Sequence, residues 1–369
     1  MTEMRGRRAG LLSCACDFDL PDDASADPVG RAQSLALIAA GFSFSVLAQA
    51  LAFAALPIAG AVLSPTPRTA MAPVVLMLAG AATATFPASF LTGLFGRRSA
   101  FALGASLGVA GAALGAWGLA SGQFAALCLG AFWLGVAQGF GLFYRHAVGS
   151  SARAVAIVLG SASLAAFAAP AIVGVAQAVA GPLAPAGALI GAALAQLCVL
   201  MLAAPLPAGV ELSQREARGL FEPWGFAAIT AAAALAWFGM MALMAGAPLA
   251  MAGCGLGLGA ASGGIAWHVL AMYAPAAVIG ASGWRPRAAL TTALGLTLLA
   301  LGCLAARMQT SAAGFDLALI IGGCGWSLAT LGATQWVHAR GAPRWLLALH
   351  DFALFAAAVC GALAATAVV

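Results

Sequence analysis

The stretch FPASFLTGLFGRRSA, residues 86–100, joins two apolar runs through a short turn with two glycines and two arginines. A related stretch, YAPAAVIGASGWRPRAA, occupies residues 273–289. Each begins with an aromatic residue and a proline, passes a pair of glycines and ends in a basic turn. The glycine pairs are Gly93 with Gly96 and Gly280 with Gly283. This repetition half a chain apart predicts a duplicated architecture.

The amino-acid composition indicates that this chain lies in a membrane. Hydrophobic residues make up 63% of the 369 residues, and charged residues make up only 7%. Apolar runs of about 20 residues, the length of a membrane-spanning helix, recur throughout. They lack the two-residue alternation of a barrel strand, and a membrane span must satisfy its own backbone hydrogen bonds. The predicted fold class is therefore an all-α polytopic membrane protein.

Eleven spans are predicted from the apolar runs. They cover residues 33–58, 69–92, 99–120, 122–145, 152–178, 183–204, 224–247, 258–281, 288–306, 313–337 and 345–367. If the N-terminus is cytoplasmic, all of the 16 basic residues except Arg68 and Arg307 fall on the cytoplasmic side. Cytoplasmic loops collect arginine, so this distribution predicts that orientation. The net charge of +5 then reflects topology, and no nucleic-acid partner is expected.

Two six-helix halves, a central polar loop and the Gly/Arg turn resemble the major facilitator superfamily over nearly the whole chain. The predicted divisions are a cytoplasmic tail 1–32, an N-terminal half 33–204, a central cytoplasmic loop 205–223 and a C-terminal half 224–369. The resemblance implies twelve helices, one more than the predicted spans. It also implies a secondary transporter, not an enzyme, that works as a monomer in the lipid bilayer of the bacterial inner membrane and rocks its halves about a central site.

The turn at residues 93–98 resembles the conformational loop of that superfamily. The matching positions are Gly93, Gly96, Arg97 and Arg98. The acidic residue that the family carries in this loop is absent here. The resemblance implies that these four residues take part in the change between conformations.

Sulfur and imidazole groups form the candidate site. Met240 and Met244 lie four residues apart in the seventh span, and His268 and Met272 lie four apart in the eighth. Four residues is about one helical turn, so each pair is predicted to share a helix face. Thioether and neutral imidazole are soft ligands suited to Cu(I). The spacing predicts a row of ligands in the order Met244, Met240, His268 and Met272 from the periplasm inward.

These two motifs resemble those of the CcoA-like copper transporters, a branch of the same superfamily. The resemblance implies an inner-membrane Cu(I) importer that supplies copper for cytochrome oxidase assembly and needs no cofactor. The copper ion would pass to a cytoplasmic copper chaperone or glutathione. Accessory ligand candidates are Met251, Cys254, Cys14 and Cys16.

Other polar residues in the spans have several interpretations. Asp316 and Asp351 are candidates for proton coupling, for helix capping or for anchoring an interface. Gln49 and Gln138 are candidates for lining the cavity from the N-terminal half. Three histidines near cytoplasmic span ends are predicted to contact solvent or lipid headgroups: His146, His338 and His350.

Two alternative functions stay open. The first keeps the fold and changes the cargo to a small organic solute, so that His268 forms hydrogen bonds or couples protons and the methionines line the cavity. The second is a membrane haem or redox subunit. Haem ligation by histidine pairs needs several inward histidines, and the sequence offers one deep histidine.

Overall fold

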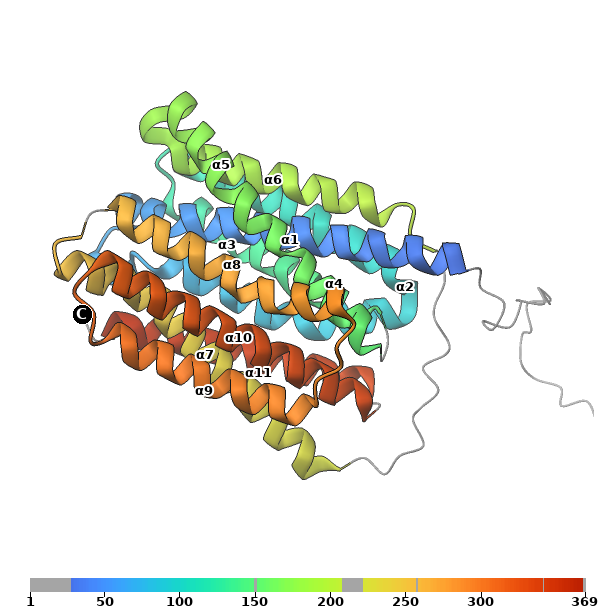
Figure 1. Cartoon of the computed structure of the whole chain (residues 1–369). Helices are drawn as coiled ribbons and strands as arrows, with labels where there is room; N and C mark the ends of the chain where they lie inside the picture. The colour runs from blue at the N-terminus through green and yellow to red at the C-terminus, as the bar shows by residue number, and fades with distance from the viewer. Residues whose placement is uncertain (1–27, 149–150, 208–221, 257, 341, 368–369) are drawn as a thin grey trace, which may run out of the picture.

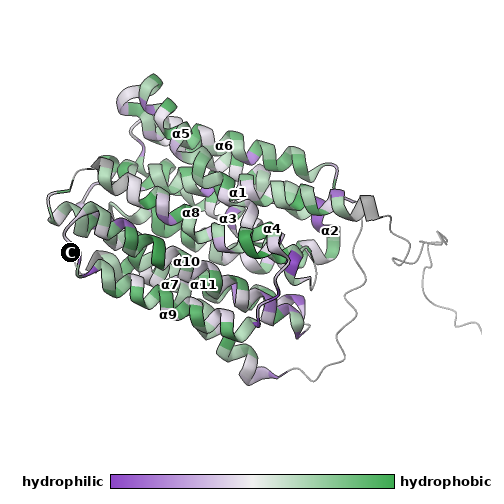
Figure 2. Cartoon of the chain, in the orientation of Figure 1, coloured by the Kyte–Doolittle hydropathy of each residue, from purple (hydrophilic) through white to green (hydrophobic). Residues whose placement is uncertain are grey.

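The computed structural model describes residues 28–148, 151–207, 222–256, 258–340 and 342–367. Within these ranges every regular element is a helix, which confirms the predicted all-α class (Figure 1). The α-helices are α1 (Pro28–Leu63), α2 (Ala72–Ala120), α3 (Phe124–Leu142), α4 (Ala152–Ser161), α5 (Ser163–Ala180), α6 (Ala184–Ala203), α7 (Pro223–Gly253), α8 (Leu258–Ser282), α9 (Ala288–Ala306), α10 (Ala312–Ala339) and α11 (Arg344–Ala367). Short 3-10 helices are η2 (Pro67–Thr69), η3 (Phe143–His146) and η4 (Gly181–Leu183). Hydrophobic residues predominate along the helices (Figure 2).

Helix α2 is a hairpin of two membrane passes. At Gly96 the backbone has φ +79°, a conformation that favours glycine and interrupts the helix. Helix α3 then packs against both arms. A Cβ on Gly135 would meet the backbone of Met77, and one on Gly111 would meet the backbone of Leu134. Met77 and Gly111 therefore contact adjacent residues of α3 and lie at the same height along it. The chain must reverse direction between them.

The predicted number of passes agrees with the structure. Nine helical stretches of the described chain are long and apolar enough to cross a membrane. Two of them, residues 67–120 and 152–203, contain a reversal, the second at Gly181, where φ is +53°. The described residues thus make eleven passes, because α4 and α5 together supply one. They include no twelfth pass.

The helices form two bundles that lie side by side (Figure 1). We call α1–α6 the N-terminal bundle and α7–α11 the C-terminal bundle. Small residues allow close helix approach inside each bundle; for example, Gly295 of α9 lies against the backbone of Ala329 in α10. Residues 208–221 lie outside the described ranges, so the predicted central loop 205–223 stays a prediction.

The bundles meet at the end of the molecule that contains Gly96, which we call the Gly96 end. Here the Ser89 hydroxyl of α2 donates to the Arg344 carbonyl of α11 at 3.0 Å. The Arg153 guanidinium of α4 donates to the Gly280 carbonyl of α8 at 3.3 Å. The arginine distribution predicts that this end is cytoplasmic. The bundles are therefore held together on the predicted cytoplasmic side.

Candidate functional site

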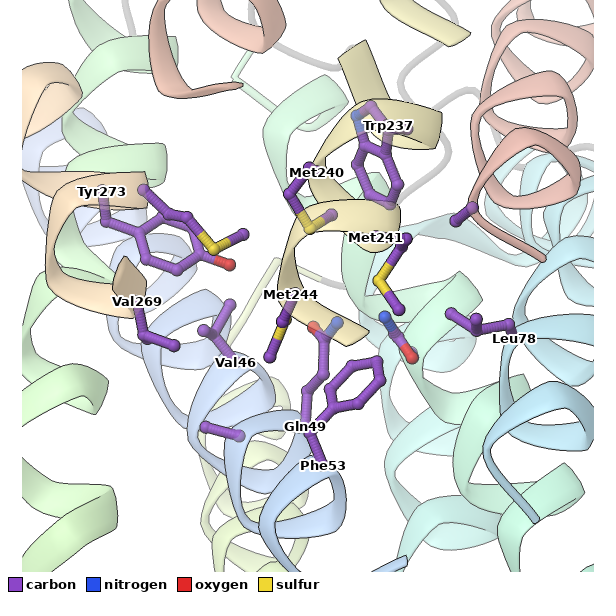
Figure 3. A pocket seen from close by; sticks show the side chains of 14 residues that line it. Val46, Gln49, Phe53, Leu78, Trp237, Met240, Met241, Met244, Val269 and Tyr273 are labelled. Atoms are coloured by element: carbon purple, nitrogen blue, oxygen red, sulfur yellow. The ribbon is translucent and has the colours of Figure 1, made fainter. Parts of the chain in front are cut away.

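A cavity lies between the two bundles at the middle of the helices. Fourteen residues line it (Figure 3). The N-terminal bundle contributes two amides, Gln49 of α1 and Gln138 of α3, as the sequence predicts. The aromatic lining consists of Phe53, Trp237 and Tyr273. The free volume is about 40 Å³, which is room for roughly three water molecules.

Methionines provide much of the C-terminal wall. Met240, Met241 and Met244 of α7 line the cavity together with Met272 of α8. Figure 3 shows the side chains of the three α7 methionines and of Gln49 gathered around the same space. The structure thus brings together three of the four predicted copper ligands, Met240, Met244 and Met272. It adds Met241, which the four-residue spacing did not single out.

His268 lies elsewhere, so the predicted row of ligands does not form as a continuous set. Its side chain is completely buried between α8 and α10, and it is not among the residues that line the cavity. Ring nitrogen Nδ1 lies 2.7 Å from the Leu319 carbonyl, which can only accept, so Nδ1 carries the proton and donates. Atom Nε2 is buried and has no hydrogen-bond partner in the described part of the chain. His268 is therefore a residue of the α8–α10 contact.

Two of the accessory ligand candidates, Met251 and Cys254, lie outside the cavity. Met251 is buried against Phe315 in a separate small cluster. Cys254 is exposed, and its Sγ lies 3.9 Å from the Gln309 carbonyl. Cys14 and Cys16 fall outside the described residues. No group of three or more His, Cys, Asp or Glu side chains converges on a metal position within the described ranges.

A buried polar cluster at the Gly96 end joins the bundles. The Arg145 guanidinium of η3 pairs with the Asp351 carboxylate of α11, and both side chains are fully buried. His146 Nε2 lies 3.1 Å from the second Asp351 oxygen. Its Nδ1 lies 2.9 Å from Nε2 of His338 in α10. Asp351 thus anchors the interface, one of the roles considered for it.

His146, His338 and His350 are predicted to contact solvent or lipid headgroups, and this prediction is wrong for two of the three. His146 and His350 are only 8% and 1% exposed. His350 Nδ1 lies 2.9 Å from the Thr230 hydroxyl of α7. The sequence places the basic pair Arg145-His146 and the acidic Asp351 near span ends on the same predicted side, but no spacing in the sequence connects the two segments.

The remaining polar candidates take distinct positions. Asp316 lies at the opposite end of α10, and its Oδ1 is buried against Gly264 of α8 without a partner among the described residues. In the turn, Arg97 donates to the Ala147 carbonyl at 2.6 Å, whereas Arg98 is exposed. Gly93 lies against the Arg344 side chain of the other bundle. The turn therefore touches both bundles, and its role in conformational change stays a prediction.

Comparison with known proteins by sequence identifies a transporter as a relative. The riboflavin transporter RfnT of Brucella anthropi is 31% identical over 338 residues, which cover 85% of each chain. No model of a known protein family matches the sequence.

Several solved transporters share the fold. The proton:xylose symporter XylE superposes with a TM-score of 0.71 at 12% identity, over 90% of this chain and 87% of that one. The human organic anion transporter MFSD10 gives 0.64 at 15% identity, over 90% and 92%. A bacterial homologue of the iron transporter ferroportin gives 0.64 at 12% identity, with the same coverage. At these identities the likeness concerns the fold alone.

Proposed function

Because the chain belongs to the major facilitator superfamily, whose members are secondary transporters and not enzymes, we propose that it carries a flat, uncharged aromatic solute of the riboflavin type across the bacterial inner membrane. Two lines of support converge on an organic cargo. The relative that is similar over most of the chain is a riboflavin transporter. The cavity between the bundles has a lining that suits an aromatic ring.

The chemistry of the lining carries the proposal. Aromatic rings from both bundles, Phe53 and Trp237 among them, provide surfaces for offset stacking. Thioether side chains adapt to irregular shapes and make favourable contacts with aromatic edges. The described residues that line the cavity include no charged side chain. A neutral ring with a few polar atoms fits this environment, whereas a phosphorylated flavin would lack the arginine or lysine that a phosphate needs.

The prediction of copper transport draws no support from these observations. The imidazole that would complete the soft ligand set, His268, lies between α8 and α10. The relative is named a riboflavin transporter, and it does not support membership of the copper-transporting branch. The methionines are therefore assigned to the apolar lining for an organic solute.

Transport requires the cavity to enlarge and to open to each side of the membrane in turn. A cavity with room for roughly three water molecules is smaller than a three-ring solute, so the bundles must separate for the ring to enter. The contact between Arg145 and Asp351 holds them together at the Gly96 end. Rocking that breaks this contact opens the cavity toward the predicted cytoplasm. The bundles are in contact at that end in this conformation, so access from the predicted cytoplasm requires this rocking.

A growth experiment tests the proposed cargo. The chain is expressed in bacteria that neither synthesise nor import riboflavin, and growth is measured over a series of riboflavin concentrations. We expect growth at micromolar riboflavin that the empty vector does not support. Excess flavin mononucleotide should not compete, because the lining offers its phosphate no cation. Equal growth with and without the chain, at verified membrane expression, would remove riboflavin as cargo.

A further inference from the structure

One amide in the cavity is buried without a partner. Gln138 of α3 lines the cavity and is 8% exposed. Its Oε1 atom makes no hydrogen bond with any part of the chain that the structure describes. A buried carbonyl oxygen without a donor costs free energy. Gln138 therefore marks the position in the lining where a bound molecule gains most by supplying an N–H group.

The second amide of the cavity differs in this respect. Gln49 of α1 is only half-buried, and none of its atoms is buried without a partner. Water can satisfy a half-buried amide whether or not a solute is present. We therefore expect ligand binding to depend on a hydrogen bond to Gln138 and to depend little on one to Gln49.

The backbone around Gln138 is held firmly in place. Gly135 and Gly139 lie on either side of it in α3, where a Cβ would meet the backbone carbonyls of Met77 and Ala81 in α2. This close approach fixes α3 against α2. A polar group on a rigid element is already oriented when its ligand arrives, which favours selective recognition.

A lining residue of the opposite bundle also carries a buried polar atom without a partner. Trp237 of α7 lines the cavity, and its indole Nε1–H is buried without an acceptor in the described ranges. Its ring packs against Phe355 with centroids 5.2 Å apart and against Trp326 with centroids 5.5 Å apart. Each bundle thus contributes one lining residue with a buried polar atom that lacks a partner among the described residues, the acceptor Oε1 of Gln138 and the donor Nε1–H of Trp237.

We propose that the Gln138 carboxamide recognises the cyclic imide or lactam edge of the transported ring, an inference that rests on the proposed function. A carboxamide carries an acceptor and a donor side by side. Oε1 accepts from a ring N–H while Nε2 donates to the adjacent ring carbonyl. The flavin ring has this edge at N3–H, which lies between two carbonyls. A ring without the N–H leaves Oε1 buried and unpaired, and sites built for a hydrogen bond reject such analogues strongly.

Riboflavin and N3-methylriboflavin provide the test, because the methyl group removes the donor and keeps the ring. Equilibrium binding to the purified full chain is measured by quenching of flavin fluorescence. We expect wild type to bind N3-methylriboflavin roughly tenfold or more weakly than riboflavin. Gln138→Leu should bind both flavins equally, at the weaker level. The matched variant Gln49→Leu removes an amide from the same cavity and should keep the ratio between the two flavins.

The outcomes separate this inference from the proposed function. No binding of riboflavin to wild type overturns the proposed function and this inference with it. Tight binding of both flavins to wild type, or a preserved ratio in Gln138→Leu, overturns the inference alone. If Gln138→Leu does not fold, Gln138→Met removes both polar atoms with an unbranched chain. If wild type binds riboflavin and N3-methylriboflavin with equal affinity, that result alone overturns the inference.

Discussion

The carboxylate of Asp351 in α11 pairs with the guanidinium of Arg145 in η3, and neither side chain has any exposed surface. The two residues belong to different bundles and lie 206 positions apart in the sequence. His146 and His338 extend the cluster by hydrogen bonds. This contact is the most deeply buried polar link between the bundles that we describe. Together with the Ser89–Arg344 and Arg153–Gly280 hydrogen bonds, it holds the Gly96 end closed.

Asp351→Asn tests the contribution of this ion pair. The substitution leaves Arg145 as a buried charge without its counter-ion, which costs about 3–5 kcal/mol. We expect a large drop in thermal stability in detergent and loss of transport. The control is Glu222→Gln, which breaks the exposed pair between Glu222 and Arg340. That change should cost at most about 1 kcal/mol. Similar shifts in the two variants would contradict the role given to Asp351.

The methionines of the cavity separate an organic cargo from a copper cargo. Met240→Leu and Met272→Leu keep volume and apolarity and cost less than about 1.5 kcal/mol each. If the thioethers only line the cavity, riboflavin uptake stays within roughly threefold of wild type. The exposed Met201 supplies the control Met201→Leu. Collapse of uptake in both cavity variants, with normal uptake in the control, would show that sulfur itself is needed.

His268 offers a second test between ligand and packing roles. His268→Asn keeps a donor near the position of Nδ1, so the bond to the Leu319 carbonyl can persist. We expect His268→Asn to transport at close to the wild-type rate. His268→Leu removes the donor and should lower stability by about 1–3 kcal/mol. Comparable loss of transport in both variants at normal stability would instead indicate that Nε2 serves the cargo.

The contact between α2 and α3 predicts a stability difference between two glycines. A Cβ on Gly135 would clash with the Met77 backbone. Gly135→Ala should therefore destabilise the protein by about 1–3 kcal/mol. Gly174 of α5 has open space around its Cβ position, so Gly174→Ala should be neutral or slightly stabilising. Thermal unfolding in the same detergent gives both values, and equal shifts would argue against the close α2–α3 packing.

The sequence predicted the helices well because their signal is local. A run of apolar residues spans a membrane whatever its neighbours are, so the eleven passes were readable before any contact was known. The methionine spacing also succeeded in part, since Met240 and Met244 share a face of α7. The prediction that Gln49 and Gln138 line the cavity is confirmed.

The failures concern contacts between distant segments. His268 and Met272 lie one turn apart, yet the histidine contacts α10 and the methionine lines the cavity. The spacing alone cannot tell which neighbouring helix a face meets. The burial of His146 likewise depends on α10 and α11, whose positions beside α3 no local pattern encodes. The copper interpretation followed from assigning all four side chains to one site.

The most direct test of the proposed cargo uses proteoliposomes that contain the purified chain. Uptake of labelled riboflavin and of labelled Cu(I) is measured side by side at matched protein amounts, with protein-free liposomes as the reference. The proposed function predicts saturable accumulation of riboflavin and copper uptake equal to that of the reference. Copper uptake above the reference without riboflavin uptake would contradict it.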